Sequence, residues 1–135
     1  MAGNLVRVVI ADDHVASLAV FTRMLHPDFD VVGTAKNGQE ALVVVNELHP
    51  DVVVLDIEMR VMNGLTAARR LRATHPAARI VFLTVYNDPD YVEAAFNLGA
   101  SGYVLKSRAA LDLPHAIRLA MLDQQFVSPG AREIN

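Results

Sequence analysis

The strongest constraint on the fold is a series of apolar, β-branched runs that each stop at a polar side chain. The run from Val52 to Leu55 is apolar at every position, which is typical of a parallel strand covered on both faces. The next residue, Asp56, therefore lies at the exposed carboxyl end of its strand. Three comparable runs end at other polar side chains, namely Asp12 and Asp13, Thr84, and Lys106. Open α/β sheets build their sites at this edge, so we expect these side chains to share one site.

Strand-like runs alternate with helical patterns along the whole chain, as in βαβ units around a parallel sheet. We expect five strands, near residues Leu5–Ala11, Val31–Ala35, Asp51–Asp56, Arg79–Thr84 and Ser101–Leu105. Right-handed crossovers with one reversal of winding give the strand order 2-1-3-4-5, which we take over from flavodoxin-like folds. The prediction is a flavodoxin-like, three-layer (βα)5 α/β domain with a five-stranded parallel sheet.

Two helix starts can be predicted from local chemistry. Asn37 can cap the second helix, with Glu40 three residues later reaching back as in a capping box. The start of the fifth helix depends on Pro114, because a helix tolerates proline only in its first turn. We therefore expect this helix to run from about Asp112 to about Gln124.

The composition fits one compact domain that does not itself bind nucleic acid. The 135 residues are 53% hydrophobic, which is ample for a buried core. The formal net charge is -3 and the basic residues are scattered, so no nucleic-acid surface is expected. We find neither a leader nor a membrane span and expect a cytoplasmic protein. The expected domain covers residues 1–127, and residues 128–135 form a tail or the start of a linker.

Three carboxylates predict a cation site. In the expected strand order, Asp12 and Asp13 lie beside Asp56. Two like charges about 5 Å apart at an effective dielectric near 20 repel by roughly 3 kcal/mol, so such a cluster persists mainly when a cation occupies it. Oxygen ligands indicate a hard ion, and Mg²⁺ suits phosphate chemistry best. His14 has no second histidine or cysteine nearby, so we interpret it as a residue of the first helical turn.

Several motifs together resemble the receiver domain of two-component response regulators. They are IADDH at 10–14, DIEMRVMNG at 56–64, LT at 83–84 and GYVLK at 102–106. The resemblance implies that Asp56 accepts a phosphoryl group from a histidine kinase, and that the domain catalyses only its own phosphorylation and autodephosphorylation. It also implies that Asp13 binds Mg²⁺ directly and Asp12 through water, while the Glu58 carbonyl and Asp56 complete the protein ligands.

The same resemblance assigns the remaining polar residues to signalling. Thr84 and Lys106 would hold the phosphoryl oxygens, and Tyr103 would be the rotameric switch. A phosphoryl group adds roughly -1.5 to -2 charge, enough to draw the Thr84 hydroxyl inward and let the Tyr103 ring move into the space behind it. The resulting population shift would change the surface of the fourth helix, fifth strand and fifth helix, where an output is controlled.

Three positions depart from the family pattern. Arg60 stands where proline is usual, which loosens its loop and adds a cation near the pocket. Ser107 replaces the usual proline after Lys106; a cis bond before a residue other than proline costs about 2.5 to 4 kcal/mol, so we expect a trans bond here. Val85 is bulkier than the usual small residue and should narrow access to the site.

The motifs ADDH at 11–14, KS at 106–107 and QFVSP at 125–129 are similar to those of NarL/FixJ-type regulators, whose receiver precedes a LuxR-type helix-turn-helix. The chain is then either a receiver excised from a longer transcription factor or a free-standing receiver that binds partners. A homodimer formed on activation is possible in both cases. In neither case do we expect this segment to bind nucleic acid directly or to contact a membrane.

Two other classes of protein compete with this interpretation. A Mg²⁺-dependent aspartyl phosphatase would place a second aspartate two residues after the nucleophile, where this chain has Glu58. A flavodoxin-like FMN binder would need a phosphate loop rich in Ser, Thr and Gly after the first strand, and this chain has none.

Overall fold

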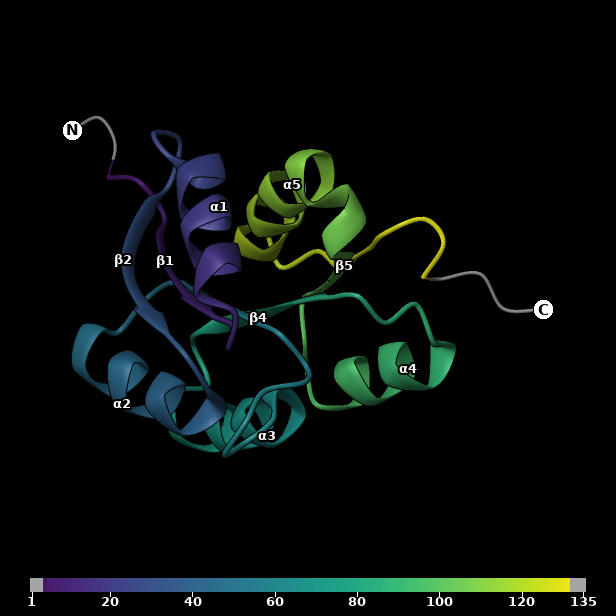
Figure 1. The fold of residues 1–135 in the computed structure, drawn as a ribbon, viewed down its shortest axis with the longest axis horizontal. Coiled ribbons are helices and arrows are strands. Elements are labelled where there is room, and N and C mark those ends of the chain that lie inside the picture. Colours follow the sequence, from purple (N-terminus) through teal and green to yellow (C-terminus); the bar gives the residue numbers. More distant parts are fainter. Residues whose placement is uncertain (1–3, 132–135) are drawn as a thin grey trace.

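The computed structural model describes residues 4–131 as one parallel sheet between two layers of helices (Figure 1). The strands are β1 Arg7–Ala11, β2 Asp30–Ala35, β3 Val52–Leu55, β4 Arg79–Thr84, β5 Gly102–Leu105 and β6 Phe126–Val127. The helices are α1 Val15–Leu25, α2 Gly38–Leu48, α3 Gly64–Thr74, α4 Pro89–Asn97 and α5 Ala109–Met121, with a short 3-10 turn, Lys106–Arg108, before α5. No helix among these residues is long and apolar enough to cross a membrane.

The sheet has the expected flavodoxin-like order with one strand more than predicted. Its order is β2-β1-β3-β4-β5-β6, so the prediction of five strands was wrong by one. In β6, Phe126 pairs with Gly102 and Val127 with Tyr103, in the same parallel sense as the other pairs. A strand of two residues is too short to give an alternating or continuous apolar pattern, which explains why the sequence did not indicate it.

The two faces of the sheet bury alternate residues of each strand against different helices. In β1, Val8 and Ile10 belong to a core cluster with residues of α1 and α5, while Val9 and Ala11 belong to a second cluster with residues of α2, α3 and α4. Figure 1 shows α1 and α5 above the sheet and the other three helices below it. Because both faces are covered, β3 is apolar and buried at all four positions, as its sequence predicted.

The predicted helix starts have different outcomes. The Asn37 side chain accepts a hydrogen bond from the Glu40 N–H at 2.8 Å, which confirms the cap. The Glu40 side chain reaches back as expected, but it accepts from the N–H of Lys36, one residue before the cap, at 2.7 Å. The start of α5 was predicted wrongly: the helix begins at Ala109 and contains Pro114 in its interior. The carbonyl that loses its partner to this proline belongs to Ala110, which is exposed and can bind water instead.

The segment after β6 stays in contact with the domain as far as the structure describes it. Ser128 and Ala131 are fully buried. The Ser128 hydroxyl donates to Asp112 Oδ2 at 2.8 Å and accepts from the Leu105 N–H at 3.1 Å, while Arg108 Nε donates to the same carboxylate oxygen at 2.7 Å. Burial alone would raise the pKa of Asp112, but these hydrogen bonds outweigh it and lower the pKa. That residues 128–135 begin a linker stays a prediction, and residues 132–135 lie outside the described part.

Candidate functional site

Strand pairing brings the predicted site residues to one edge of the sheet. Ala11 at the end of β1 pairs with Leu55 at the end of β3, so Asp12 and Asp56 follow neighbouring positions. Thr84 pairs in the same way with Leu105, the residue before Lys106. The register of the sheet, fixed by its apolar residues, therefore sets the site.

Gly64 closes the loop that follows Asp56. Its N–H donates to the Ile57 carbonyl at 2.7 Å, which folds residues 57–63 back over the strand end. A Cβ atom at this position would lie 1.9 Å from the Asp56 carbonyl oxygen, so only glycine fits without a shift of the backbone. Asn63 then caps α3 by accepting from the Thr66 N–H at 2.9 Å.

Lys106 bridges two buried carboxylates. Its Nζ atom lies 2.9 Å from Asp56 Oδ2, in a hydrogen bond, and 2.6 Å from Asp12 Oδ2, in an ion pair. The side chains of Asp12 and Asp56 are 2% and 8% exposed, so these charges interact with little screening by water. The other Asp56 oxygen, Oδ1, accepts from the Ile57 N–H at 2.7 Å. Each oxygen of the Asp56 carboxylate therefore has a hydrogen-bond donor that holds it in place.

Burial and neighbouring charges shift the pKa values of two residues of the site. Burial raises the pKa of Asp56, and this effect exceeds the opposing effect of the Lys106 ammonium group. For Lys106, burial would lower the pKa, but the carboxylates of Asp12 and Asp56 outweigh it and raise the pKa. Lys106 is therefore protonated at neutral pH and supplies a positive charge beside Asp56.

The donors of the acidic pocket suit a hard cation. Asp12 Oδ2 and Asp13 Oδ1 are buried without a hydrogen bond, although the Lys106 ammonium group lies beside the first. One ligand atom each from Asp12, His14 and Asp56 lie within 4.8 Å of one another. The set could hold a metal ion, and its carboxylates fit Mg²⁺. The structure does not test the expected ligand role of the Glu58 carbonyl, which stays a prediction.

Tyr86 connects the predicted switch residues and was missed in the sequence. Its N–H donates to Thr84 Oγ1 at 3.3 Å, and its carbonyl accepts from the Tyr103 hydroxyl at 2.7 Å. Thr84 and Tyr103 are both fully buried, and burial raises the pKa of the Tyr103 hydroxyl. The Tyr86 hydroxyl donates to the Glu58 side chain. No sequence motif marks Tyr86, because its role depends on where the loop after β4 places its backbone.

The three departures from the family pattern have local consequences. Arg60 Nε lies 3.8 Å from Asp13 Oδ2, so this residue adds a cation beside the pocket. The Lys106–Ser107 bond is trans as predicted, since His26–Pro27 is the only cis bond within residues 4–131. Val85 is 69% exposed, which gives no support to the expected narrowing of access.

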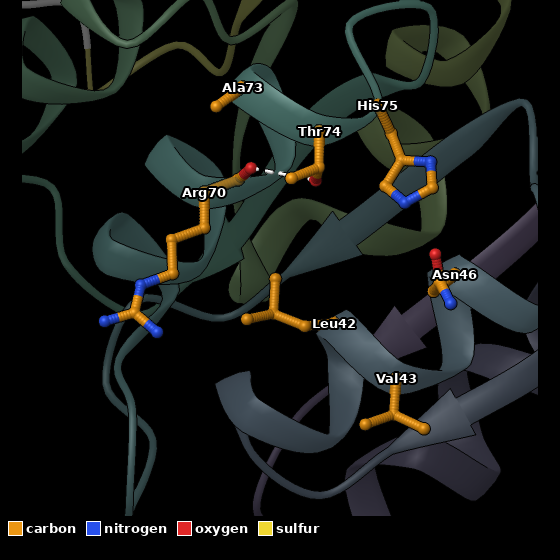
Figure 2. Close-up of a pocket in the computed structure, with 7 residues that line it drawn as sticks. All are labelled: Leu42, Val43, Asn46, Arg70, Ala73, Thr74 and His75. Carbon is orange, nitrogen blue, oxygen red and sulfur yellow. Dashed lines mark hydrogen bonds between the residues drawn. The ribbon is translucent and has the colours of Figure 1, made fainter.

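The hollow drawn in Figure 2 lies away from this edge of the sheet. It is formed between α2 and α3 by residues that include Leu42, Val43, Arg70 and Thr74. In Figure 2 the Arg70 side chain points out from α3, and the hydrogen bond drawn is the one from Thr74 Oγ1 to the Arg70 carbonyl. None of the residues that line the hollow carries a carboxylate, so it belongs to a different surface from the acidic pocket.

A parallel sheet of this order, with buried aspartates, a threonine and a lysine at its carboxyl edge, defines a signalling domain of the receiver class. The family model described as the response regulator receiver domain matches residues 8–118. The chain belongs to this family of two-component signalling domains.

Relatives and solved structures agree with this assignment. The chain is 38% identical over 128 residues to the response regulator GacA of Pseudomonas viridiflava, covering 93% of this chain and 59% of that protein. It is 34% identical over 131 residues to the transcriptional regulatory protein DesR of Bacillus subtilis (strain 168), covering 96% and 65%. A crystal structure of a LuxR-family two-component response regulator from Aurantimonas sp. SI85-9A1 superposes with a TM-score of 0.89 at 32% identity, covering 95% and 93%.

A second structural neighbour is the isolated REC domain of RcsB from Salmonella enterica serovar Typhimurium with the phosphomimetic BeF3-. It superposes with a TM-score of 0.85 at 27% identity, and the match covers 95% of this chain and 96% of that chain.

The chain spans about 59% of GacA and 65% of DesR. It therefore corresponds to the receiver part of these longer proteins.

Proposed function

We propose that this domain is a signalling switch controlled by phosphorylation of Asp56, with the phosphohistidine of a histidine kinase as donor. The observation that carries the proposal is the placement of the Asp56 carboxylate. It is held from one side by Lys106 Nζ and from the other by the Ile57 N–H, at the open edge of the sheet. One carboxylate oxygen attacks phosphorus as the P–N bond to the donor imidazole breaks. The products are an acyl phosphate on Asp56 and a free imidazole, which keeps the bonding electron pair and takes a proton.

The surrounding residues suit this transfer. Lys106 offsets negative charge on the transferring group, and the buried Thr84 hydroxyl supplies a hydrogen bond at the same edge. Asp12, Asp13 and Asp56, with the Glu58 carbonyl, would hold Mg²⁺. When bound, that ion supplies charge neutralisation for phosphoryl oxygens. Asp12 Oδ2 and Asp13 Oδ1 are buried and accept no hydrogen bond, which supports this ligand set.

The output follows from the connection through Tyr86. A phosphoryl group that draws Thr84 inward removes the acceptor of the Tyr86 N–H, and the Tyr86 carbonyl is what holds the Tyr103 hydroxyl. Movement of Tyr103 would then change the surface formed by α4, β5 and α5. We infer that this surface controls transcription through a DNA-binding domain and forms a homodimer on activation. We place this output in the cytoplasm, since the relatives include transcriptional regulators.

One experiment separates an aspartyl phosphatase from a receiver. A free-standing receiver would form the same adduct on Asp56 and use the same switch to bind another protein, while an aspartyl phosphatase would turn over its phosphodonor without accumulating an adduct. Incubation with acetyl phosphate and Mg²⁺, followed by intact mass and peptide mapping, should give one adduct on Asp56. Asp56→Asn should remove the adduct, whereas the exposed control Asp90→Asn should keep it. Steady release of phosphate without an accumulated adduct would favour the phosphatase, and a full-level adduct in Asp56→Asn would refute the assignment of Asp56.

A further inference from the structure

His14 lies against the acidic pocket, although its sequence context indicated only a residue of the first helical turn. The backbone N–H of His14 donates to Asp12 Oδ1 at 2.9 Å, which places the start of the side chain beside the pocket. Its ring atom Nδ1 lies 3.3 Å from Asp12 Oδ1 and 3.1 Å from Asp13 Oδ1. We propose that Asp12, His14 and Asp56 form a site for a first-row transition-metal ion, represented by Zn²⁺. His14 is the residue that makes this site prefer such an ion to Mg²⁺.

The geometry needs little adjustment to hold such an ion. Zinc binds imidazole nitrogen and carboxylate oxygen at about 2.0 to 2.2 Å, so two ligand atoms of one ion lie at most roughly 4.3 Å apart. The ligand atoms of these three residues already lie within 4.8 Å of one another. The His14 side chain is 72% exposed, so its ring is free to rotate the remaining distance toward the buried carboxylates.

The carboxylates keep oxygen atoms available for the ion even with Lys106 in place. The ammonium group contacts Oδ2 of both Asp12 and Asp56. Their Oδ1 atoms accept one backbone N–H each, from His14 and Ile57, and a carboxylate oxygen has a second lone pair. Asp13 Oδ1 is also buried without a hydrogen bond and lies beside the imidazole, where it can act as a fourth ligand.

The imidazole changes which ion the pocket prefers. Carboxylate and water oxygens suit Mg²⁺, whereas imidazole nitrogen suits zinc and its neighbours, which bind mixed nitrogen and oxygen sites more tightly. Asp12, His14 and Asp56 would supply three ligands, and either Asp13 Oδ1 or water would complete a four-coordinate zinc site. Zn²⁺ and Mg²⁺ would share the carboxylates of Asp12 and Asp56, so bound Zn²⁺ would displace the Mg²⁺ that the transfer uses. In this respect the inference rests on the proposed function, and it makes Zn²⁺ a competitor of Mg²⁺.

Calorimetric titration of the purified domain with Zn²⁺ and, separately, with Mg²⁺ tests the site. Loss of a residue that hydrogen-bonds a metal ligand typically weakens metal binding 10-fold to 100-fold. Loss of the ligand itself in His14→Gln should therefore weaken Zn²⁺ binding by at least about tenfold. The loss for Mg²⁺ should be much smaller, because Mg²⁺ selects oxygen. Excess Mg²⁺ should weaken the apparent binding of Zn²⁺ to the wild type, because both ions use the same carboxylates.

The matched control is His75→Gln. The rings of His49 and His75 lie 5.6 Å apart at the opposite end of the sheet and are the obvious competing zinc ligands. Unchanged Zn²⁺ affinity in His14→Gln, or a loss confined to His75→Gln, would overturn the proposal. So would a Zn²⁺ titration that excess Mg²⁺ does not affect. Acetyl phosphate labelling of the wild type tests the proposed function separately, and its failure would leave a His14-dependent Zn²⁺ titration standing.

Discussion

Removal of the Lys106 ammonium group should show how much this cation stabilises the folded state by offsetting repulsion between the buried carboxylates. In Lys106→Met the side chain keeps its length and apolar stem but leaves Asp12 and Asp56 without their shared cation. At an effective dielectric of about 20, each contact, at 2.6 and 2.9 Å, is worth roughly 6 kcal/mol of Coulomb attraction. The cost of burying the ammonium group offsets several kcal/mol of this.

The expected net effect is a loss of about 3 kcal/mol in the free energy of unfolding at pH 7, the lower end of the range for breaking a buried pair. We choose the lower end because the Lys106 side chain is still 16% exposed. Urea unfolding at fixed ionic strength measures this loss. Millimolar Mg²⁺ should restore part of it, since a cation that binds only the folded state stabilises that state.

Two comparisons decide whether the charges are responsible. The only other lysine, Lys36, is exposed, and Lys36→Met should change the free energy of unfolding by no more than about 0.5 kcal/mol. In an Asp56→Asn background, Lys106→Met should cost clearly less, because one of the two stranded carboxylates has gone. A Lys106→Met protein as stable as the wild type, or an equal loss in both backgrounds, would refute the reasoning.

Three further predictions concern the same site and its surroundings. Because the pKa of Asp56 is raised above 3.8, the folded state binds this proton more tightly than the unfolded chain, and that contribution to stability is lost as pH rises through the raised pKa. As pH rises from acid to neutral, the free energy of unfolding of Asp56→Asn should therefore increase relative to that of the wild type. If the free energies of the two proteins changed equally with pH, this prediction would be contradicted. Mg²⁺ should raise the melting temperature of the wild type, and Asp13→Asn should lose most of this increment, so an equal increment in both proteins would count against Asp13 as a ligand. Thr84→Ala should still accept beryllofluoride at Asp56 but give smaller amide shifts around Tyr103 and α4, and shifts equal to those of the wild type would exclude the switch through Thr84.

The positions of the buried strands and of the site residues could be predicted because they depend on local patterns. Continuous apolar runs mark the strands, and the residues that follow them, such as Asp56 and Lys106, must reach the same edge of a parallel sheet. Tyr86 and Ser128 could not be predicted in this way. Their roles come from hydrogen bonds to Tyr103 and Asp112, 17 and 16 residues away in the sequence. Only the folded chain brings these partners together.

Pro114 shows a further way in which sequence reasoning falls short. The rule that proline belongs in the first turn ignored the solvent beside Ala110, which removes much of the cost of a missing hydrogen bond. This error came from applying a sound local rule without knowing the surroundings.

The short strand β6 also protects the sheet from self-association. It covers part of the open edge of β5, where the Phe126 N–H bonds to the Ser101 carbonyl at 3.1 Å and the Ser128 N–H to the Tyr103 carbonyl at 2.9 Å. A chain cut before Phe126 would expose these carbonyls along an apolar strand, the arrangement that recruits strands of other molecules. Such a shortened domain should aggregate more readily than the longer one at the same protein concentration, even though it keeps Asp12, Asp56, Thr84 and Lys106.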